Sequence, residues 1–314
     1  MYICFDLGGT ALKYGYGTPE RGLLHHGAVH LTDKSRQGIY RLMLSTASEL
    51  LGRLPAGEHI EAVALGSPGI VDAAAGRILS HCPNLPQWQG AEPGDELRRE
   101  LGVPVFVDND ANLMTYGEAS RFGFSRIVLG ITLGTGIGGG LVMGREIYTG
   151  SAWQAMELGH TIVEPGGRPC NCGRRGCIEK YASATAIVEL AQTAMQQASG
   201  ADVNEMDNPT VKQILDYAVD NKTVHDVILH QIDRLGLVLA NAITLLAPDV
   251  LLVGGGLCEI ASFPWEALER SVRSNLLHGK AMSIAIERAG LGNRAALVGG
   301  LFQCRHKMEN NTRF

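Results

Sequence analysis

Residues 2–17 read YICFDLGGTALKYGYG, two apolar runs joined by a glycine turn. The first run, Tyr2–Phe5, is typical of a buried strand, and the second, Leu12–Gly17, predicts another strand rather than a helix. A P-loop or a dinucleotide-binding fold would enter a helix at this point, with phosphate at the helix N-terminus. The strand–turn–strand pattern therefore indicates a different phosphate-binding device.

The turn itself, Asp6-Leu-Gly-Gly-Thr10, is a candidate phosphate loop. We expect Gly8 and Gly9 to expose backbone N–H groups and Thr10 to add a hydroxyl. Asp6 sits where a carboxylate can hold a magnesium ion through water. The alternative is a β-hairpin turn that needs glycine for its backbone geometry and binds nothing.

The stretch TLGTGIGGG, residues 132–140, repeats this pattern between predicted strands at 125–132 and 141–143. Its glycine spacing formally matches a dinucleotide fingerprint, but no helix follows, and this excludes a dinucleotide site. The similarity to the first turn instead predicts a duplicated domain with two phosphate loops facing one cleft.

The rest of the chain alternates predicted strands and helices. Such alternation predicts α/β domains, whose ligands gather at the carboxyl ends of strands. A third glycine run, Gly254-Gly-Gly256, follows one of these strands and marks another close approach of backbone. Strands are expected at 23–31, 62–65, 105–107 and 250–253, and helices at 33–54, 95–101, 111–122, 184–197, 211–220, 224–246 and 295–306.

Polar side chains crowd the end of the predicted strand Val105–Val107, in the sequence Asp108-Asn-Asp-Ala-Asn112. Asp110 is therefore a candidate general base. The alternative role for Asp110 is structural, as an N-cap that accepts hydrogen bonds from the first free amides of the following helix.

The stretch ELGHTIVEPGGRPCNCGRRGCIE, residues 157–179, places Cys170, Cys172 and Cys177 within eight residues, with His160 ten residues upstream. Three thiolates and an imidazole fill a tetrahedral zinc shell and leave no position open for substrate, which argues for a structural ion. The alternatives are a reduced cysteine cluster or a disulfide. A disulfide would leave one of the three cysteines unpaired.

Two carboxylates, Glu157 and Glu179, flank this cysteine loop. A zinc ion that fixes the loop would also fix both carboxylates. The arrangement indicates a binding site that is held in shape by the metal.

Composition describes an ordinary globular protein, with 45% apolar and 19% charged residues. A length of 314 residues favours two domains, and a net charge of −5 argues against a basic nucleic-acid surface. We expect no membrane span, because no apolar run is long enough, and no secretory segment, because the apolar start lacks a basic region. With seven cysteines, this predicts a protein of the reducing cytoplasm.

Taken together, the motifs resemble the ROK family (repressors, open reading frames, kinases), and the resemblance covers essentially the whole chain. The cysteine motif with its upstream Glu-x-Gly-His is the specific part, whereas the glycine turns alone are not. In order, the motifs are Asp6-x-Gly-Gly-Thr-x-x-Lys13, Asn109-Asp-Ala-Asn112, Leu133-Gly-Thr-Gly-x-Gly138, Glu157-x-Gly-His160, Cys170-x-Cys-Gly-x-x-Gly-Cys177-x-Glu179 and Gly254-Gly-Gly256.

The resemblance implies an α/β, actin-like (ribonuclease H-like) duplicated fold of two domains, with ATP and sugar in the cleft between them. Residues 1–111 and a C-terminal helix at about 296–314 would form the smaller domain, and residues 112–295 the larger one with the zinc loop. It also implies an ATP-dependent kinase that uses Mg²⁺ and a structural Zn²⁺, phosphorylates a hexose or amino sugar at carbon 6, and forms a homodimer.

The same resemblance assigns roles to single residues. Asp110 would be the catalytic base, and His160 would bind both zinc and sugar, with Cys170, Cys172 and Cys177 as the other zinc ligands. The implied sugar ligands are Asn84, Asn109, Glu157, His160 and Glu179, and the implied nucleotide and magnesium contacts are Asp6, Gly8, Gly9, Thr10, Lys13, Thr132, Gly134, Thr135, Gly136, Gly254 and Gly255.

One segment departs from the family pattern. The family usually has Gly-Ala-x-Gly-x-Ala-Gly-Glu, whereas residues 150–157 read GSAWQAME, so that Trp153 and Met156 replace two glycines. The sugar therefore stays open among glucose, N-acetylmannosamine, fructose, allose and a β-glucoside. The rival functions are a sugar-responsive repressor and an inactive sugar sensor. Against the repressor stand the lack of room for a DNA-reading domain ahead of Tyr2, the acidic net charge and the presence of Asp110. Against the inactive sensor stand the retained Asp110 and both phosphate loops.

Overall fold

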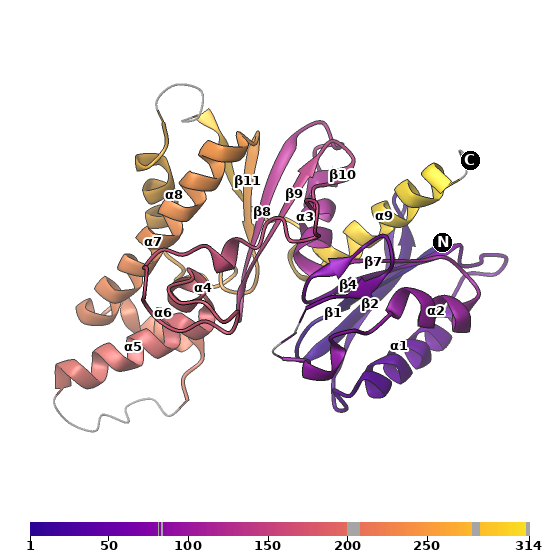
Figure 1. Cartoon of the computed structure of the whole chain (residues 1–314), viewed down its shortest axis with the longest axis horizontal. Helices are drawn as coiled ribbons and strands as arrows, with labels where there is room; N and C mark the ends of the chain where they lie inside the picture. Colours follow the sequence, from indigo (N-terminus) through magenta and orange to yellow (C-terminus); the bar gives the residue numbers. More distant parts are fainter. Residues whose placement is uncertain (81, 83, 200–207, 278–282, 312–314) are drawn as a thin grey trace. The chain divides into compact units, whose positions relative to one another are not determined.

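The computed structural model describes residues 1–80, 82, 84–199, 208–277 and 283–311. Its strands and helices build two five-stranded sheets with helices packed on them (Figure 1). In chain order the elements are β1 (Tyr2–Leu7), β2 (Ala11–Thr18), β3 (Gly22–His30), α1 (Arg36–Leu51), β4 (Ala62–Ser67), β5 (Val71–Asp72), β6 (Arg77–Ile78), α2 (Pro93–Leu101), β7 (Val105–Asn109), α3 (Asp110–Ser120), β8 (Ile127–Leu133), β9 (Ile137–Met143), β10 (Glu146–Ile147), α4 (Glu179–Ala182), α5 (Ala184–Ser199), α6 (Val211–Ala218), α7 (Lys222–Leu246), β11 (Val250–Gly254), α8 (Trp265–Ser274), β12 (Ala285–Arg288) and α9 (Ala295–Asn311).

Contacts within the chain divide it into two compact units. Unit 1 comprises Met1–Arg126, Gly140–Ala155 and Asn293–Phe314, and unit 2 comprises Ile127–Gly139 and Met156–Gly292. The C-terminal helix α9 thus belongs to the unit that contains the N-terminus.

The two sheets repeat one topology. The first has the order β3-β2-β1-β4-β7 and the second the order β10-β9-β8-β11-β12. In the first, β1 pairs antiparallel with β2 and parallel with β4; in the second, β9 and β10 are antiparallel, and β8, β11 and β12 are parallel. This repetition confirms the duplication that was predicted from the two glycine turns.

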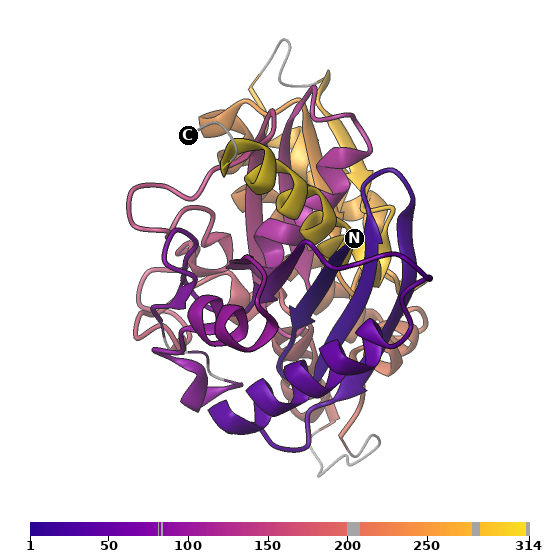
Figure 2. The same ribbon diagram turned by 90° about the vertical axis from the view of Figure 1, so that its right-hand side faces the viewer.

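Alternation along β1 explains how unit 1 buries both faces of its sheet. Ile3 and Phe5 face the core formed with α1 and α2, whereas Tyr2 and Cys4 face α9. Figures 1 and 2 show α1 and α2 on one side of this sheet and α9 on the other. A strand that is buried on both faces reads as a continuous apolar run, as Tyr2–Phe5 does.

The strand β9 begins earlier than predicted, at Ile137 instead of Leu141, so the glycine run lies inside a strand. These glycines allow neighbouring backbone and side-chain atoms to pack closely against the strand. A Cβ atom at Gly139 would lie 2.7 Å from the carbonyl oxygen of Met156, and one at Gly140 would lie 2.5 Å from Oγ1 of Thr115. Glycine composition alone suggested a turn because a strand interior seldom contains three glycines.

None of the helices in the described part of the chain combines the length and the apolar character needed to cross a bilayer. This holds for the 25-residue helix α7 too.

The helices α3 and α9 cross at the closest contact in unit 1. A Cβ atom at Gly117 would overlap the carbonyl oxygen of Ala295, and one at Gly299 would overlap that of Leu113. The backbones therefore touch directly, and both positions require glycine for lack of space.

We expect Gly299→Ala to lower the free energy of unfolding by about 1–3 kcal/mol, because the added methyl group forces two buried helices apart. Denaturant unfolding measures this. Gly52→Ala is the matched control: its methyl group would lie at an ordinary 3.5 Å from the nearest backbone oxygen, at φ −67°. Equal stability of the two variants would contradict the packing argument.

Candidate functional site

The first glycine turn, Leu7–Ala11, is closed by a hydrogen bond in which the Gly8 N–H donates to the Ala11 carbonyl, at 2.9 Å. The Gly8 amide is therefore used within the turn, contrary to the expectation that it is exposed. In the described part of the chain, no acceptor is found for the amides of Gly9 and Thr10. These two N–H groups and the exposed Thr10 hydroxyl are the donors of the turn that stay available for an anion.

Asp6 ends the same strand beside this turn and is buried, at 7% exposure. The β1–β2 register places it opposite Lys13, whose Nζ lies 3.0 Å from Oδ2 of Asp6. Lys13 thus forms an ion pair with the buried Asp6 next to the turn.

Asn84 lies against the first glycine turn. A Cβ atom at Gly9 would be 2.8 Å from the Asn84 Cβ, and Asn84 is exposed. The structure thus brings an exposed amide to the amides of the turn, although 75 residues separate it from Gly9 in the sequence.

Asn109, and not Asp110, is the N-cap of α3. Its Oδ1 accepts hydrogen bonds from the amides of Ala111 at 2.9 Å and Asn112 at 3.2 Å, and its Nδ2 donates to the Gly69 carbonyl. The capping role that competed with catalysis for Asp110 is therefore occupied by its neighbour. Asp110 is the first helical residue.

Asp110 is half-buried near a second carboxylate. A Cβ atom at Gly66 would lie 3.5 Å from the Asp110 Cα and 3.6 Å from the Asp6 Oδ1. Burial, and then the negative charge of Asp6, raise the pKa of Asp110 to about 7, against the opposing effects of the Ala111 N–H and of Lys13. A carboxyl group with this pKa can accept a proton near neutral pH.

Asp108 forms a buried hydrogen-bond network that sequence reasoning did not identify. Its Oδ1 accepts from the Asn109 N–H at 2.8 Å and from Asn112 Nδ2 at 2.9 Å, and its Oδ2 accepts from Gln303 Nε2 at 3.0 Å. Burial raises the pKa of Asp108, and these donors oppose the rise. The one feature of the sequence that could have indicated this network is Gln303, a polar residue on the apolar face of the last helix.

In unit 2, the second glycine turn, Leu133–Ile137, is also closed by a hydrogen bond from its first glycine, although the acceptor lies two residues on instead of three. The Gly134 N–H donates to the Gly136 carbonyl at 3.0 Å, and no acceptor in the described residues takes the amides of Thr135 and Gly136. Thr132 adds its hydroxyl, which accepts from the Gly138 N–H at 3.2 Å.

Glu179 lies directly on this second turn. Its Oε2 accepts from the Ile137 N–H at 3.0 Å, and a Cβ atom at Gly136 would lie 2.5 Å from the same oxygen. The neighbouring carboxylate, Glu157, keeps solvent exposure, while its protein surroundings and then Glu179 raise its pKa against the opposing effect of His160. Unit 2 thus brings Glu157 within electrostatic reach of both His160 and Glu179.

Gly254 and Gly255 end β11 beside the same turn. Gly255 adopts φ +93°, and a Cβ atom there would overlap the Leu133 backbone. At Gly254 the methyl group would lie 2.6 Å from the Ala289 Cβ. Close backbone packing explains both glycines.

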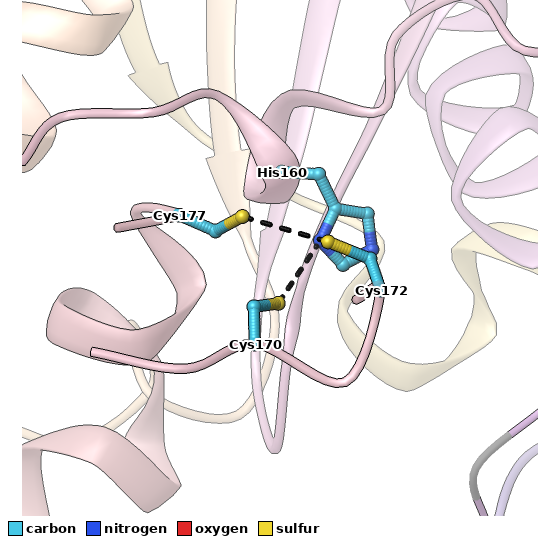
Figure 3. A group of neighbouring side chains, drawn as sticks. All are labelled: His160, Cys170, Cys172 and Cys177. Atoms are coloured by element: carbon cyan, nitrogen blue, oxygen red, sulfur yellow. Dashed lines mark hydrogen bonds between the residues drawn. The ribbon is translucent and has the colours of Figure 1, made fainter. Parts of the chain in front are cut away.

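His160, Cys170, Cys172 and Cys177 converge, with their ligand atoms all within 4.8 Å of one another. Figure 3 shows the imidazole and the three sulfur atoms pointing toward one another. Cys170 Sγ lies 3.5 Å from His160 Nδ1, and Cys172 Sγ lies 3.6 Å from Cys177 Sγ. Bonds of about 2.3 Å from zinc to sulfur in a tetrahedron put ligand atoms roughly 3.8 Å apart, so these residues fit a zinc ion.

Local backbone bonds shape this loop. The Cys170 N–H donates to the Arg174 carbonyl, the Gly173 N–H donates to the Cys170 carbonyl, and Gly173 adopts φ +85°. Cys172 is exposed, and although burial acts in the opposite direction, hydrogen bonds from Arg174 lower its pKa to about 6. A lowered thiol pKa favours the thiolate form that binds metal.

Trp153 and Met156 both adopt left-handed backbone conformations, at φ 59° and 65°. Glycine, which the family usually has here, adopts such conformations without strain. The backbone has therefore kept a glycine-type geometry although both side chains are large.

We expect Asn109→Ala to lower the free energy of unfolding by about 1 kcal/mol, because it removes the cap of α3. Asp110→Asn should leave stability nearly unchanged, since Asp110 is not the cap. Denaturant unfolding of both variants tests this, and a larger loss in Asp110→Asn would overturn the assignment of the cap.

Comparison with known proteins identifies the family of this chain. The model of the ROK family matches residues 2–306. A glucokinase of Thermotoga maritima is 30% identical over 311 residues, which cover 94% of this chain and 96% of that protein.

Two solved structures are similar over nearly the whole length. A ROK hexokinase from Thermus thermophilus is 28% identical, with a TM-score of 0.84, and the match covers 98% of this chain and 99% of that chain. A ROK family glucokinase from Streptomyces griseus, in complex with glucose and AMPPNP, is 30% identical, with a TM-score of 0.78 and coverage of 97% and 99%. These matches confirm the predicted actin-like, duplicated α/β fold. The chain belongs to the ROK family.

Proposed function

We propose that this chain is an ATP-dependent sugar kinase that transfers the γ-phosphate of ATP to the carbon-6 hydroxyl of a hexose or amino sugar. The observation that carries the proposal is Asp110, whose pKa is raised to about 7 by burial and by Asp6. Its neighbour Asn109 is the N-cap of α3, and Asp110 Oδ1 accepts one helix amide, that of Ala111, at 2.9 Å. Similarity to glucokinases supports the choice of substrate class.

In this mechanism Asp110 accepts the proton of the sugar hydroxyl as the oxygen attacks the γ-phosphorus in line. The free amides of Gly9 and Thr10 in unit 1, and of Thr135 and Gly136 in unit 2, would donate hydrogen bonds to phosphate oxygens. Mg²⁺ would supply further charge neutralisation, and Asp6 is the residue that would hold it through water, with Lys13 beside it.

We assign sugar binding to the polar groups that surround these turns. Asn84 and Asn109 would contact hydroxyls from unit 1, and Glu157, His160 and Glu179 from unit 2. Gly254 and Gly255 would lie along the adenosine.

We also propose that the two compact units correspond to the two kinase domains. The boundaries expected from the family are 1–111 with about 296–314 for one domain and 112–295 for the other. They differ from the units in residues 112–126, Gly140–Ala155 and 293–295, all of which belong to unit 1.

We expect Asp110→Asn to lower turnover by about a hundredfold or more, the usual scale for losing a positioned base, with a smaller change in sugar affinity. A coupled ADP-release assay across hexoses and amino sugars measures it. Asp226→Asn, an exposed acid on α7, is the matched control and should keep full activity. Near-normal turnover of a folded Asp110→Asn chain would end the proposal.

The pH profile gives a second readout of the same residue. The base must be deprotonated, and its raised pKa means that kcat/KM for sugar falls as pH drops below about 7.

The rival, a sugar-responsive regulator, predicts sugar binding without ADP release from any sugar in the screen. That result would favour regulation over catalysis.

We propose that His160, Cys170, Cys172 and Cys177 hold one structural zinc ion per chain. The ion would close the loop and fix His160, together with Glu179, which follows Cys177 by two residues. A ligand set without a free position supplies shape, and no chemical step is assigned to it.

We expect metal analysis of the chain purified without chelator to give one zinc per chain, and Cys172→Ser to give almost none. Loss of the ion should also lower the unfolding temperature, because metal binding stabilises the folded loop. Cys258→Ser, a buried cysteine outside the cluster, should keep its zinc. Protein that contains no zinc from the start would refute the assignment.

A further inference from the structure

Unit 1 contains a cavity of about 200 Å³ that is separate from every residue assigned above to sugar, nucleotide or zinc. It lies between α3, α9 and the segment that follows β9. The residues that matter for its chemistry are Asp108, Tyr116, Trp153, Gln303, His306 and Lys307.

A buried acceptor without a partner lines this cavity. Gln303 is 3% exposed, and its Nε2 donates to Asp108 Oδ2, which fixes the orientation of the amide. Its Oε1 then has no hydrogen-bond partner among the described residues. Leaving a buried acceptor unpaired costs about 1–3 kcal/mol, which a hydroxyl group in the cavity would recover.

The charged groups at the cavity mouth are mostly paired with each other. His306 Nε2 lies 2.8 Å from Glu146 Oε1, and Arg145 Nη1 lies 3.3 Å from Glu309 Oε2. Both pairs use hydrogen-bonding groups at the cavity mouth that a ligand would otherwise meet.

Lys307 is the exception. It is half-buried, and no ion pair involves it in the described part of the chain. The charge of Lys307 acts on the nearby Asp108, whose two carboxyl oxygens already accept three hydrogen bonds from other donors. The Lys307 ammonium group therefore keeps hydrogen-bond donors for an anionic ligand.

Trp153 adds an aromatic wall. Its side chain lines the cavity from a left-handed backbone conformation, at φ 59°, where the family usually has glycine. A left-handed backbone conformation at a residue other than glycine costs of order 1–3 kcal/mol, which the contacts of the Trp153 side chain must offset. An indole ring offers an apolar face and an N–H donor, a combination that suits the ring of a sugar.

We propose that this cavity binds a small hydroxylated anion of the sugar-phosphate class. The phosphate would pair with Lys307, a hydroxyl would donate to Gln303 Oε1, and the sugar ring would lie against Trp153. Binding of this kind does not require the chain to be a kinase.

The test is calorimetric titration of the full chain with glucose 6-phosphate, with saturating glucose in cell and syringe to occupy the proposed catalytic sugar site. Lys307→Met should weaken binding by about tenfold or more, the scale of a lost hydrogen bond to a charged group. Trp153→Gly should weaken it too. Lys212→Met, an exposed lysine of α6, is the matched control and should bind like the unmodified chain.

The outcomes separate this site from the catalytic one. Binding that is unchanged in Lys307→Met, or absent altogether, overturns the proposal. Inorganic phosphate binding as tightly as glucose 6-phosphate also overturns it, because the hydroxyl and ring contacts would then contribute nothing. Loss of kinase activity in Asp110→Asn with intact glucose 6-phosphate binding would leave the cavity site standing by itself.

Discussion

The structure of unit 1 depends on the return of the last helix to the first sheet. The α9 backbone touches α3 at Gly299. At Gly300 it lies so close to Cys4 of β1 that a side chain larger than that of glycine has no room. On the same helix, Gln303 donates to Asp108, 195 residues away. Asp108 in turn accepts the Asn109 amide, and Asn109 caps α3. The position of the candidate base is thus fixed by a chain of contacts that ends on the C-terminal helix.

Duplication explains what the two units share, and the differences show what each contributes. Both turns are closed by a hydrogen bond from the N–H of their first glycine, from Gly8 to the Ala11 carbonyl and from Gly134 to the Gly136 carbonyl. Both leave the next two amides without an acceptor among the described residues. The strand-end position that is Asp6 in the first copy is Thr132 in the second. The first copy therefore carries the charged pair with Lys13, whereas the second holds a neutral hydroxyl bond. In the proposed mechanism, the magnesium contact Asp6 and the general base Asp110 therefore both come from unit 1.

Sequence patterns predicted the fold and most of the candidate site because these depend on local rules. Apolar runs, glycine turns and closely spaced cysteines are all visible within short windows, and the cluster of Cys170, Cys172 and Cys177 around His160 forms as predicted. Three features were not predicted from the sequence because they depend on geometry or on distant residues. The cap is Asn109 instead of its neighbour, the Gly8 amide is used internally, and Asp108 meets a partner from the opposite end of the chain.

The left-handed backbone conformations of Trp153 and Met156 show how a fold can constrain the segment that leads into the proposed sugar-binding residues. The backbone here leads into Glu157 and the 3₁₀ turn that carries His160, and the His160 ring must reach the cysteine cluster. If the backbone had relaxed to suit the new side chains, those ligands would have moved. The geometry was kept instead, so strain of order 1–3 kcal/mol per residue must be offset by side-chain contacts. For Trp153 these contacts lie in the cavity beside Asp108, and the change therefore acts on unit 1, away from the zinc ligands.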